Sequence, residues 1–190
     1  MEFSDETAVA RARAGDADGF RVLVERHSRP LFHLAFRLTG NEQDAEDVVQ
    51  ETFLRAYKQL ESFESRASFG TWIYRIAANY SLDLVRSRKR YQDQRPGGDA
   101  EQDLLLAAPS SDTLPDRMAY SAQVQKSIAS AMAALSEQER TAFVLRHFEG
   151  LSIEEIAGAL GVGASATKHS VFRAVQKLRR ALEPLVNTAI

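Results

Sequence analysis

Apolar residues recur at helical spacing along almost the whole of this 190-residue chain, and no segment shows a convincing alternation of apolar and polar positions. The helices that this pattern predicts cover residues 6–14, 17–38, 42–60, 68–90, 136–148, 152–160 and 164–182. Ser136 with Glu139, and Ser152 with Glu155, have the spacing of a capping box, which gives two of these helices a defined start. The fold class expected is all-α.

The last two predicted helices are joined by a glycine turn. Gly161 can supply a left-handed residue that ends the first of them, and Gly163 is a tolerable N-cap for the second. Two short helices joined in this way are typical of a helix-turn-helix, whose second helix can enter a major groove.

One face of that second helix is polar and basic. The residues on this face are Ser165, Lys168, His169, Phe172, Arg173 and Gln176. Between positions 164 and 182 there are five Lys or Arg, Lys177 among them, and no acid. This charge suits contact with phosphates, but a basic helix end also complements its own dipole in an ordinary bundle. The segment alone leaves DNA binding and simple bundle packing both open.

The composition changes sharply between residues 92 and 116. This segment holds three of the five prolines and six acids, with Arg95 as its single base. Such a composition buries little apolar surface, so we expect a flexible acidic linker with a short helix over residues 104–107. The chain is then predicted to form two small helical domains, residues 7–90 and 118–186, joined by a linker over residues 91–117.

Overall composition excludes several classes of protein. A net charge of −2 argues against a protein that coats nucleic acid indiscriminately. The absence of cysteine excludes disulfides, a thiolate nucleophile and cysteine-ligated zinc. We find no apolar leader at the N-terminus and no apolar run long enough to span a bilayer, so we expect a cytoplasmic protein without membrane insertion.

The predicted helix over residues 42–60 has an acidic face. Asp44, Asp47 and Glu51 are spaced by three and four residues, so that they share this face and repel one another. The face is either solvated or a docking surface for a partner, and the spacing does not decide between the two.

Aromatic and basic residues interleave over residues 69–79, and a basic cluster follows over residues 86–90. Aromatic rings can stack on unpaired bases while Arg and Lys hold the backbone, which is the logic of single-strand binding. The alternative is that Trp72, Ile73 and Ile76 belong to the core. A polar loop over residues 62–67 precedes this helix and is a further candidate for recognition.

Together these motifs resemble the extracytoplasmic-function type of bacterial sigma factor, the small members of the sigma-70 family. The segments that carry the resemblance are DAEDVVQETFLRAY, FGTWIYRIAANYSLDLVRSRKR and ALSEQERTAFVLRHFEGLSIEEIAGALGVG. They follow the order of the family and cover residues 8–90 and 127–182, with the linker as spacer. Several spaced motifs in one order are more specific than a single helix-turn-helix.

The resemblance implies a role for each segment. It implies docking of the acidic helix on the clamp coiled coil of the largest polymerase subunit through Asp44, Asp47, Val48, Gln50, Glu51 and Phe53. It implies capture and melting of the −10 promoter element by Phe63, Trp72, Tyr74, Arg75 and Asn79, with the basic residues Arg86, Arg88, Lys89 and Arg90. It implies reading of the −35 element by Ser165, Lys168, His169, Phe172, Arg173 and Lys177. The implied partners are core RNA polymerase, promoter DNA and an anti-sigma factor, with no catalytic residue, metal or cofactor.

The chain departs from the family pattern on both base-reading surfaces. Family members commonly have Ser and Arg where this chain has His169 and Ser170, and Arg-Gly-Asp where it has Glu64, Ser65 and Arg66. These departures leave the class intact and concern the promoter sequence.

Two other functions were considered. A dimeric helix-turn-helix regulator that occupies an operator without polymerase leaves the acidic helix and the aromatic helix unexplained. A di-metal enzyme built on a helical bundle needs Glu-x-x-His pairs, and none of the four histidines has an acid three residues before it.

Overall fold

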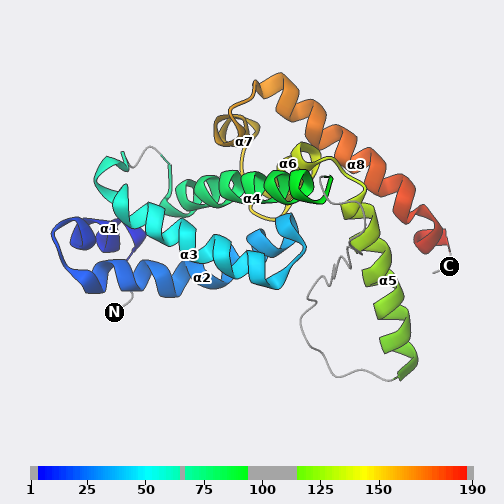
Figure 1. The fold of residues 1–190 in the computed structure, drawn as a ribbon, viewed down its shortest axis with the longest axis horizontal. Coiled ribbons are helices and arrows are strands. Elements are labelled where there is room, and N and C mark those ends of the chain that lie inside the picture. Colours follow the sequence, from blue (N-terminus) through cyan, green and yellow to red (C-terminus); the bar gives the residue numbers. More distant parts are fainter. Residues whose placement is uncertain (1–3, 65–66, 94–114, 188–190) are drawn as a thin grey trace.

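The computed structural model describes residues 4–64, 67–93 and 115–187, and its regular elements within these ranges are all helical. The elements are α1 (Asp5–Arg13), α2 (Ala17–Thr39), α3 (Glu42–Lys58), the 3₁₀ turn η1 (Leu60–Ser62), α4 (Phe69–Asp93), α5 (Pro115–Ala133), α6 (Glu137–His147), α7 (Ile153–Leu160) and α8 (Ala164–Asn187) (Figure 1). The predicted all-α class is confirmed.

Several helix bounds differ from the prediction, and α8 runs to Asn187 where an end at residue 182 was expected. The helix expected over residues 42–60 ends at Lys58, and η1 follows it. Helix α4 continues to Asp93 and α5 begins at Pro115, so three residues at each end of the expected linker are helical. The short helix expected over residues 104–107 lies outside the described residues.

Side chains that precede the helices determine where several of them begin. In the capping box of α6, Glu139 N donates to Ser136 Oγ at 3.2 Å, and Ser136 N donates to Glu139 Oε2 at 2.9 Å. The same reciprocal pair forms between Ser152 and Glu155 at the start of α7. Both predicted capping boxes are therefore confirmed. Each satisfies two backbone donors that a helix start leaves without partners.

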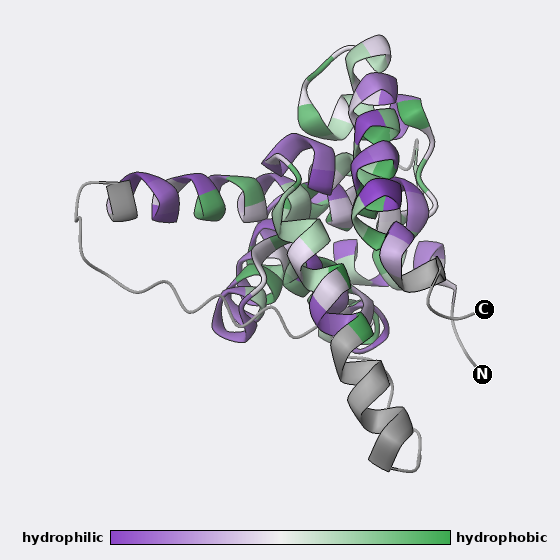
Figure 2. Ribbon diagram, turned by 90° about the vertical axis from the view of Figure 1, so that its right-hand side faces the viewer, coloured by the Kyte–Doolittle hydropathy of each residue, from purple (hydrophilic) through white to green (hydrophobic). Residues whose placement is uncertain are grey.

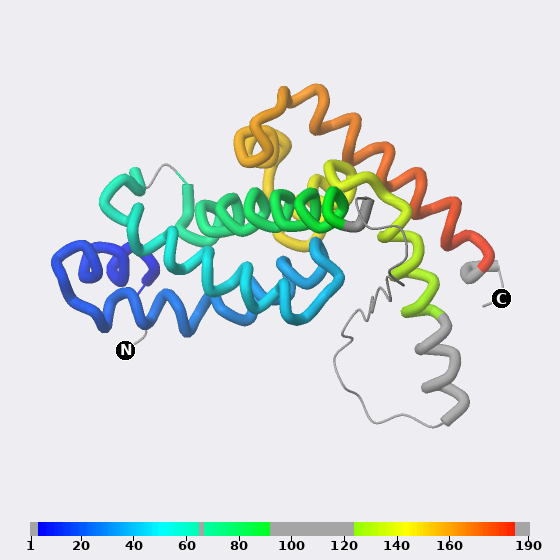
Figure 3. Tube along the Cα trace, viewed as in Figure 1, coloured from blue at the N-terminus to red at the C-terminus, as the bar shows by residue number. Residues whose placement is uncertain are grey.

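The first four helices form one bundle. Helices α2, α3 and α4 pack side by side, and α1 lies against α2 at one end of the bundle (Figure 3). Their apolar faces meet in a core in which Leu23, Leu31, Val48, Ile73 and Ala77 are fully buried. The final part of α4 extends beyond the bundle (Figure 2), and every residue from 86 to 91 is exposed.

Helices α5 to α8 form the second bundle, and α7 and α8 are its helix-turn-helix. Val144, Ile156 and Ala174 are fully buried at their meeting point, and Leu178 is nearly so. Gly161 ends α7 in the left-handed conformation with φ of 64°. The turn that the glycines predicted is thus present, and α8 starts three residues later.

The two bundles pack against each other through a half-buried arginine. Arg140 of α6 donates to the carbonyls of Met132 and Ala133, at the end of α5, at 3.1 and 3.2 Å. It also donates to Leu38 O, near the end of α2, at 3.3 Å. One guanidinium therefore binds carbonyls near two helix ends in different domains, where unpaired carbonyls concentrate.

A second group of residues closes the domain interface at Glu149. The guanidinium of Arg37 lies 4.2 Å from the centre of the Phe148 ring, and its Nη1 lies 3.8 Å from Glu149 Oε1. The Tyr74 hydroxyl donates to the Glu149 carboxylate, whose side chain is only 9% exposed. Burial raises the pKa of Glu149 in spite of Arg37, and burial next to this carboxylate raises the pKa of Tyr74 to about 12.

Two glycines of the helix-turn-helix should respond oppositely to alanine. Gly161→Ala places a Cβ on a left-handed residue and should lower the free energy of unfolding by about 1–2 kcal/mol. Gly158→Ala, within α7 and equally free of neighbours within 4 Å, should raise it by about 0.5–1 kcal/mol. Chemical denaturation of both variants measures the difference. Equal effects would contradict the left-handed turn.

The pH dependence of stability should change in Glu149→Gln. The folded protein binds a proton on Glu149 more tightly than the unfolded chain does, because burial raises the pKa of this carboxyl. The stability gained from protonated Glu149 is therefore complete below the ordinary Glu pKa, and it is lost as pH rises through the raised pKa of Glu149 in the folded protein. The variant should therefore melt above the wild type at about pH 8, and the difference should vanish near about pH 4. Thermal unfolding across this range is the measurement, with exposed Glu154→Gln as the control. A difference that does not depend on pH would refute the prediction.

Candidate functional site

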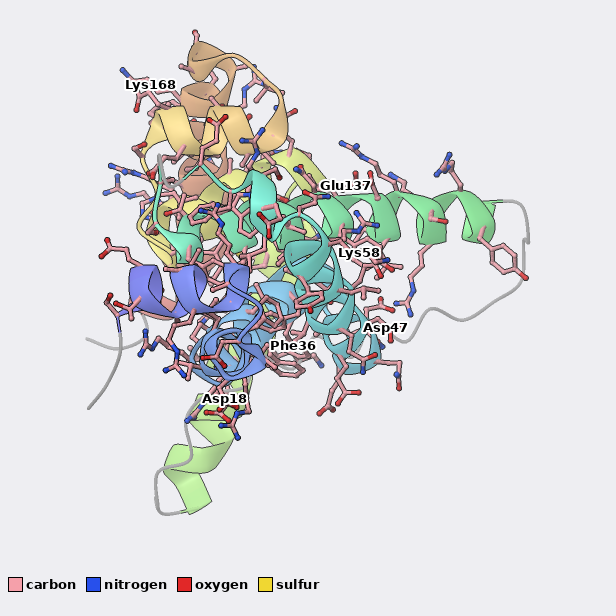
Figure 4. The ribbon with its side chains drawn as sticks, turned by 90° about the vertical axis from the view of Figure 1, so that its left-hand side faces the viewer. Asp18, Phe36, Asp47, Lys58, Glu137 and Lys168 are labelled. Atoms are coloured by element: carbon pink, nitrogen blue, oxygen red, sulfur yellow. The ribbon has the colours of Figure 1, made fainter. Side chains whose placement is uncertain are left out.

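The polar face of α8 is exposed as predicted. On the opposite side of the helix, Ala174 and Leu178 are buried and anchor α8 in the second bundle. The exposed residues are Ser165, Lys168, His169, Phe172 and Arg173. Lys168 projects into solvent at the tip of the second bundle (Figure 4). Five of the six residues predicted to read the −35 element therefore lie together on one accessible face.

The two departures on this face differ in where they point. Ser170 donates its hydroxyl to Ala166 O at 3.0 Å and so turns back onto its own helix. His169 Nδ1 lies 2.8 Å from Ser165 O, which orients the ring of this exposed residue. Of the two, His169 is the residue presented outward.

Lys177, the sixth residue, forms an ion pair within its own domain. Its Nζ lies 2.6 Å from Glu139 Oε2 in the capping box of α6. Burial of Glu139 opposes ionisation, but the hydrogen bonds from Lys177 and Ser136 hold the pKa of this carboxyl below its ordinary value. Lys177, whose side chain is 49% exposed, thus ties α8 to α6.

The loop before α4 begins at Phe63, whose aromatic ring is buried. Phe63 is only 7% exposed, and its ring lies 4.8 Å from Trp72 and 6.0 Å from Phe69, between ring centres. Trp72 is half-buried beside it. Glu64 is exposed, whereas Ser65 and Arg66 lie outside the described residues.

A hollow of about 550 Å³ opens beside this aromatic cluster. Its first wall comprises Ser62, Phe63, Glu64, Ala67, Thr71, Trp72 and Arg75. Glu154, Glu155 and Gly158 of α7 form the facing wall. Predicted −10 residues therefore face the first turn of α7 across an open space.

Helix α4 carries an exposed stripe along its length. Arg75, Asn79, Arg86 and Arg90 are separated by four, seven and four residues, a spacing that puts them on one side of the helix. Arg86 Nε lies 3.2 Å from Glu137 Oε2 at the start of α6. The stripe is basic and begins one turn after Trp72.

Two further predicted −10 residues of α4 are engaged within the protein, and a third, Lys89, is exposed. Tyr74 is half-buried and turned toward Glu149 in the domain interface. Arg88 forms an ion pair with Asp44 of α3. Lys89 is exposed at the end of α4.

The predicted docking residues of α3 divide into buried and exposed groups. Asp44, Val48 and Phe53 are 4%, 0% and 8% exposed, so they belong to the interior of the bundle. Burial raises the pKa of Asp44, and Arg88 offsets only part of this effect. Asp47 and Gln50 are exposed, and half-buried Glu51 accepts a hydrogen bond from Arg55 Nε at 2.7 Å.

Two exposed apolar residues that the sequence prediction did not include lie beside the predicted docking residues. Leu54 is 48% exposed and Tyr57 is 61% exposed. With Asp47 and Gln50 they follow helical spacing, which places all four on one outward stripe. That spacing was the available signal, and the same spacing puts Phe53 on the core face with Val48. Asp47 points outward, away from Lys168 (Figure 4).

The described residues offer no group of three or more His, Cys, Asp or Glu that could hold a metal ion. None of the helices within these ranges is long and apolar enough to cross a membrane.

Comparison with protein families matches both bundles. Residues 23–91 match Sigma-70 region 2, and residues 125–178 match Sigma-70, region 4. The first match covers α3 with most of α2 and α4, and the second covers α6, α7, most of α5 and the first part of α8.

Curated relatives are similar over nearly the whole chain. The ECF RNA polymerase sigma factor SigW of Bacillus subtilis is 30% identical over 187 residues, covering 97% of this chain and 100% of SigW. The RNA polymerase sigma-H factor of Pseudomonas aeruginosa is 32% identical and covers 97% of both chains. SigE of Mycolicibacterium smegmatis is 34% identical over 94% of this chain and 69% of its own.

Solved structures show the same fold. CnrH, in complex with the cytosolic domain of CnrY, has a TM-score of 0.66 and 27% identity over 95% of this chain and 97% of its own. The sigma factor RpoE of Bartonella quintana, in complex with the anti-sigma factor NepR, has a TM-score of 0.69 and 25% identity over 86% of this chain and 96% of its own. The sigma factor family is not an enzyme class. With both regions matched and relatives of this length, the chain belongs to the sigma-70 family as an extracytoplasmic-function RNA polymerase sigma factor.

Proposed function

We propose that this sigma factor works through three separate surfaces, one on α3, one on α4 with its preceding loop, and one on α8. The observation that carries the proposal is the exposed face of α8, where Lys168, Phe172 and Arg173 stand together on the second helix of a helix-turn-helix. Such a helix enters the major groove, where side chains reach base edges. This face reads the −35 element.

The α3 stripe docks on core polymerase. Asp47 and Gln50 supply polar contacts at one end, and Leu54 and Tyr57 supply apolar area at the other. Exposed aromatic residues are frequent anchors of protein interfaces because they bury a large area with few rotatable bonds. Asp44, Val48 and Phe53 hold α3 in place and act on docking through the position of the helix.

The α4 surface captures the −10 element as a single strand. Trp72 offers a ring for stacking, and Arg75, Arg86 and Arg90 lie along the same side for the backbone. Asn79, within the same stripe, is suited to hydrogen-bond an unpaired base. Extruding a base costs a few kcal/mol of stacking, which such contacts offset.

An anti-sigma factor is the proposed regulator. Two relatives of known structure, CnrH and RpoE, were solved in complex with CnrY and with the anti-sigma factor NepR.

In this chain Tyr74 and Arg86 contact Glu149 and Glu137 of the second bundle, so promoter DNA that binds the α4 surface must replace those contacts. The chain performs no catalysis of its own and acts in the cytoplasm, where the polymerase supplies the chemistry.

The test is reconstitution with core RNA polymerase followed by selection of bound DNA from a random pool. A sigma factor yields a pool with two enriched elements and specific transcription starts from it. Operator binding by a dimer without polymerase would instead support the helix-turn-helix regulator. Absence of core binding would overturn the proposal.

Removing an exposed anchor from α3 should weaken core binding selectively. Tyr57→Ala should lower the affinity for core polymerase by more than about 1 kcal/mol, roughly fivefold, because an aromatic anchor is lost. Fluorescence anisotropy of labelled sigma against core measures this. Tyr91→Ala is the matched control, since Tyr91 is 59% exposed on α4 against 61% for Tyr57. Equal losses in both variants would remove the α3 stripe from the docking surface.

Truncating either basic residue of the α8 face should weaken binding of the upstream element. Lys168→Ala and Arg173→Ala should each cost about 1–3 kcal/mol if the residue contacts a base edge. Holoenzyme binding to a −35 duplex at several salt concentrations provides the measurement. Lys126→Ala, an exposed lysine of α5, is expected to bind as the wild type does. Unchanged affinity in Lys168→Ala and Arg173→Ala would exclude these residues from the interface.

A further inference from the structure

Helix α1 lies before the residues that match region 2, and it is packed so closely on α2 that its position is well defined. Gly19 of α2 is buried, and a Cβ added there would lie 2.6 Å from Ala12 N and 2.7 Å from Ala8 O. Ala8 and Val9 are nearly fully buried against the core. The two helices therefore approach at a distance that only glycine permits, and the end of α1 is held beside η1.

Arg13, the last residue of α1, binds both ends of the segment that leads into the loop. Its Nε donates to Leu60 O at 3.0 Å, and its Nη2 donates to Phe63 O. The guanidinium carbon also lies 5.9 Å from the centre of the Phe63 ring. A planar guanidinium presents several donors in fixed directions, so that one side chain can hold two carbonyls in one geometry.

These two carbonyls determine where the aromatic cluster begins. Phe63 follows η1 directly, and its ring packs against Trp72 and Phe69 of α4. Phe69 and Trp72 are themselves in contact, with ring centres 5.7 Å apart. The orientation of Trp72 in the 550 Å³ hollow therefore depends on the backbone that Arg13 holds.

The other end of α1 supports the same cluster independently. Asp5 Oδ2 lies 2.8 Å from His27 Nε2, and Arg26 pairs with the second oxygen of this carboxylate. The oriented His27 ring packs on Phe69, with ring centres 5.4 Å apart. Helix α1 thus holds both sides of the loop. Arg13 holds the start of the loop at Phe63, and Asp5, through His27, supports Phe69 where the loop ends.

We propose that Arg13 is a positioning residue of the −10 surface, which holds Phe63 and thereby Trp72 in the arrangement that receives the unpaired promoter strand. The proposal rests on the function assigned above to α4 and its loop. Arg13 does not touch DNA in this mechanism. Its loss disorganises the stacking surface while the α3 stripe and the α8 face remain intact.

The experiment measures three affinities of each variant: for core polymerase, for a −35 duplex, and, as holoenzyme, for a single-stranded −10 oligonucleotide. The −10 sequence is the one that the wild-type holoenzyme selects, and a scrambled strand serves for comparison. Arg13→Ala should bind the −10 strand about five- to tenfold more weakly, the loss expected for one base stack. It should also discriminate less against the scrambled strand, while its other two affinities stay within about twofold.

Two further variants separate positioning from folding. Arg13→Lys keeps the charge but offers one donor group in place of the fork, so it should lose −10 binding selectively, by less than Arg13→Ala. Arg21→Ala removes an arginine of α2 whose side chain is 66% exposed, and it should behave as the wild type.

The outcomes distinguish failure of the Arg13 proposal from failure of the −10 function proposed for α4. A parallel loss of all three affinities in both Arg13 variants would show a general folding defect and overturn the positioning role. Wild-type affinity and discrimination in Arg13→Ala would overturn it as well, with the assigned function untouched. A wild-type holoenzyme that does not prefer the −10 strand over the scrambled strand would overturn both.

Discussion

The packing of α4 is the constraint on which the rest of the structure depends. This 25-residue helix buries Ile73, Ala77 and Ala78 against α2 and α3. Another part of its surface meets α6 and α7 of the second bundle. Because one helix serves both domains, the side chains left exposed on it are confined to a stripe and a projecting end. The surface of α4 proposed to bind DNA is the part that neither the first bundle nor the second bundle covers.

Charged and polar groups at these interfaces are paired across domains. Tyr74 with Glu149 and Arg86 with Glu137 join α4 to the second bundle. The Arg86 pair is partly exposed, so water competes with it and its net contribution to stability is small. The Arg86 pair therefore holds the bundles together only weakly, whereas the pair of Tyr74 with the buried Glu149 is shielded from water.

Much of the local structure was predictable because its causes lie within a few residues. The capping boxes at Ser136 and Ser152, the left-handed Gly161 and the exposed face of α8 follow from spacing and backbone chemistry alone. Helical spacing also places Phe53 on the core face of its helix with Val48, where both are buried. The family resemblance, by contrast, implies docking through these two residues, and the exposed apolar residues of the helix are Leu54 and Tyr57.

The sequence by itself determined the helical class, the starts and ends of most helices, and the motif order that identifies the family. Hydrogen bonds between near neighbours and a repeat of 3.6 residues encode these features locally. Only the tertiary structure decided that Asp44 is buried beside Arg88, that Tyr74 meets Glu149 and that Arg13 reaches Phe63. Each of these contacts joins residues far apart in the chain, so its partner is set by how helices dock and not by any spacing within one segment.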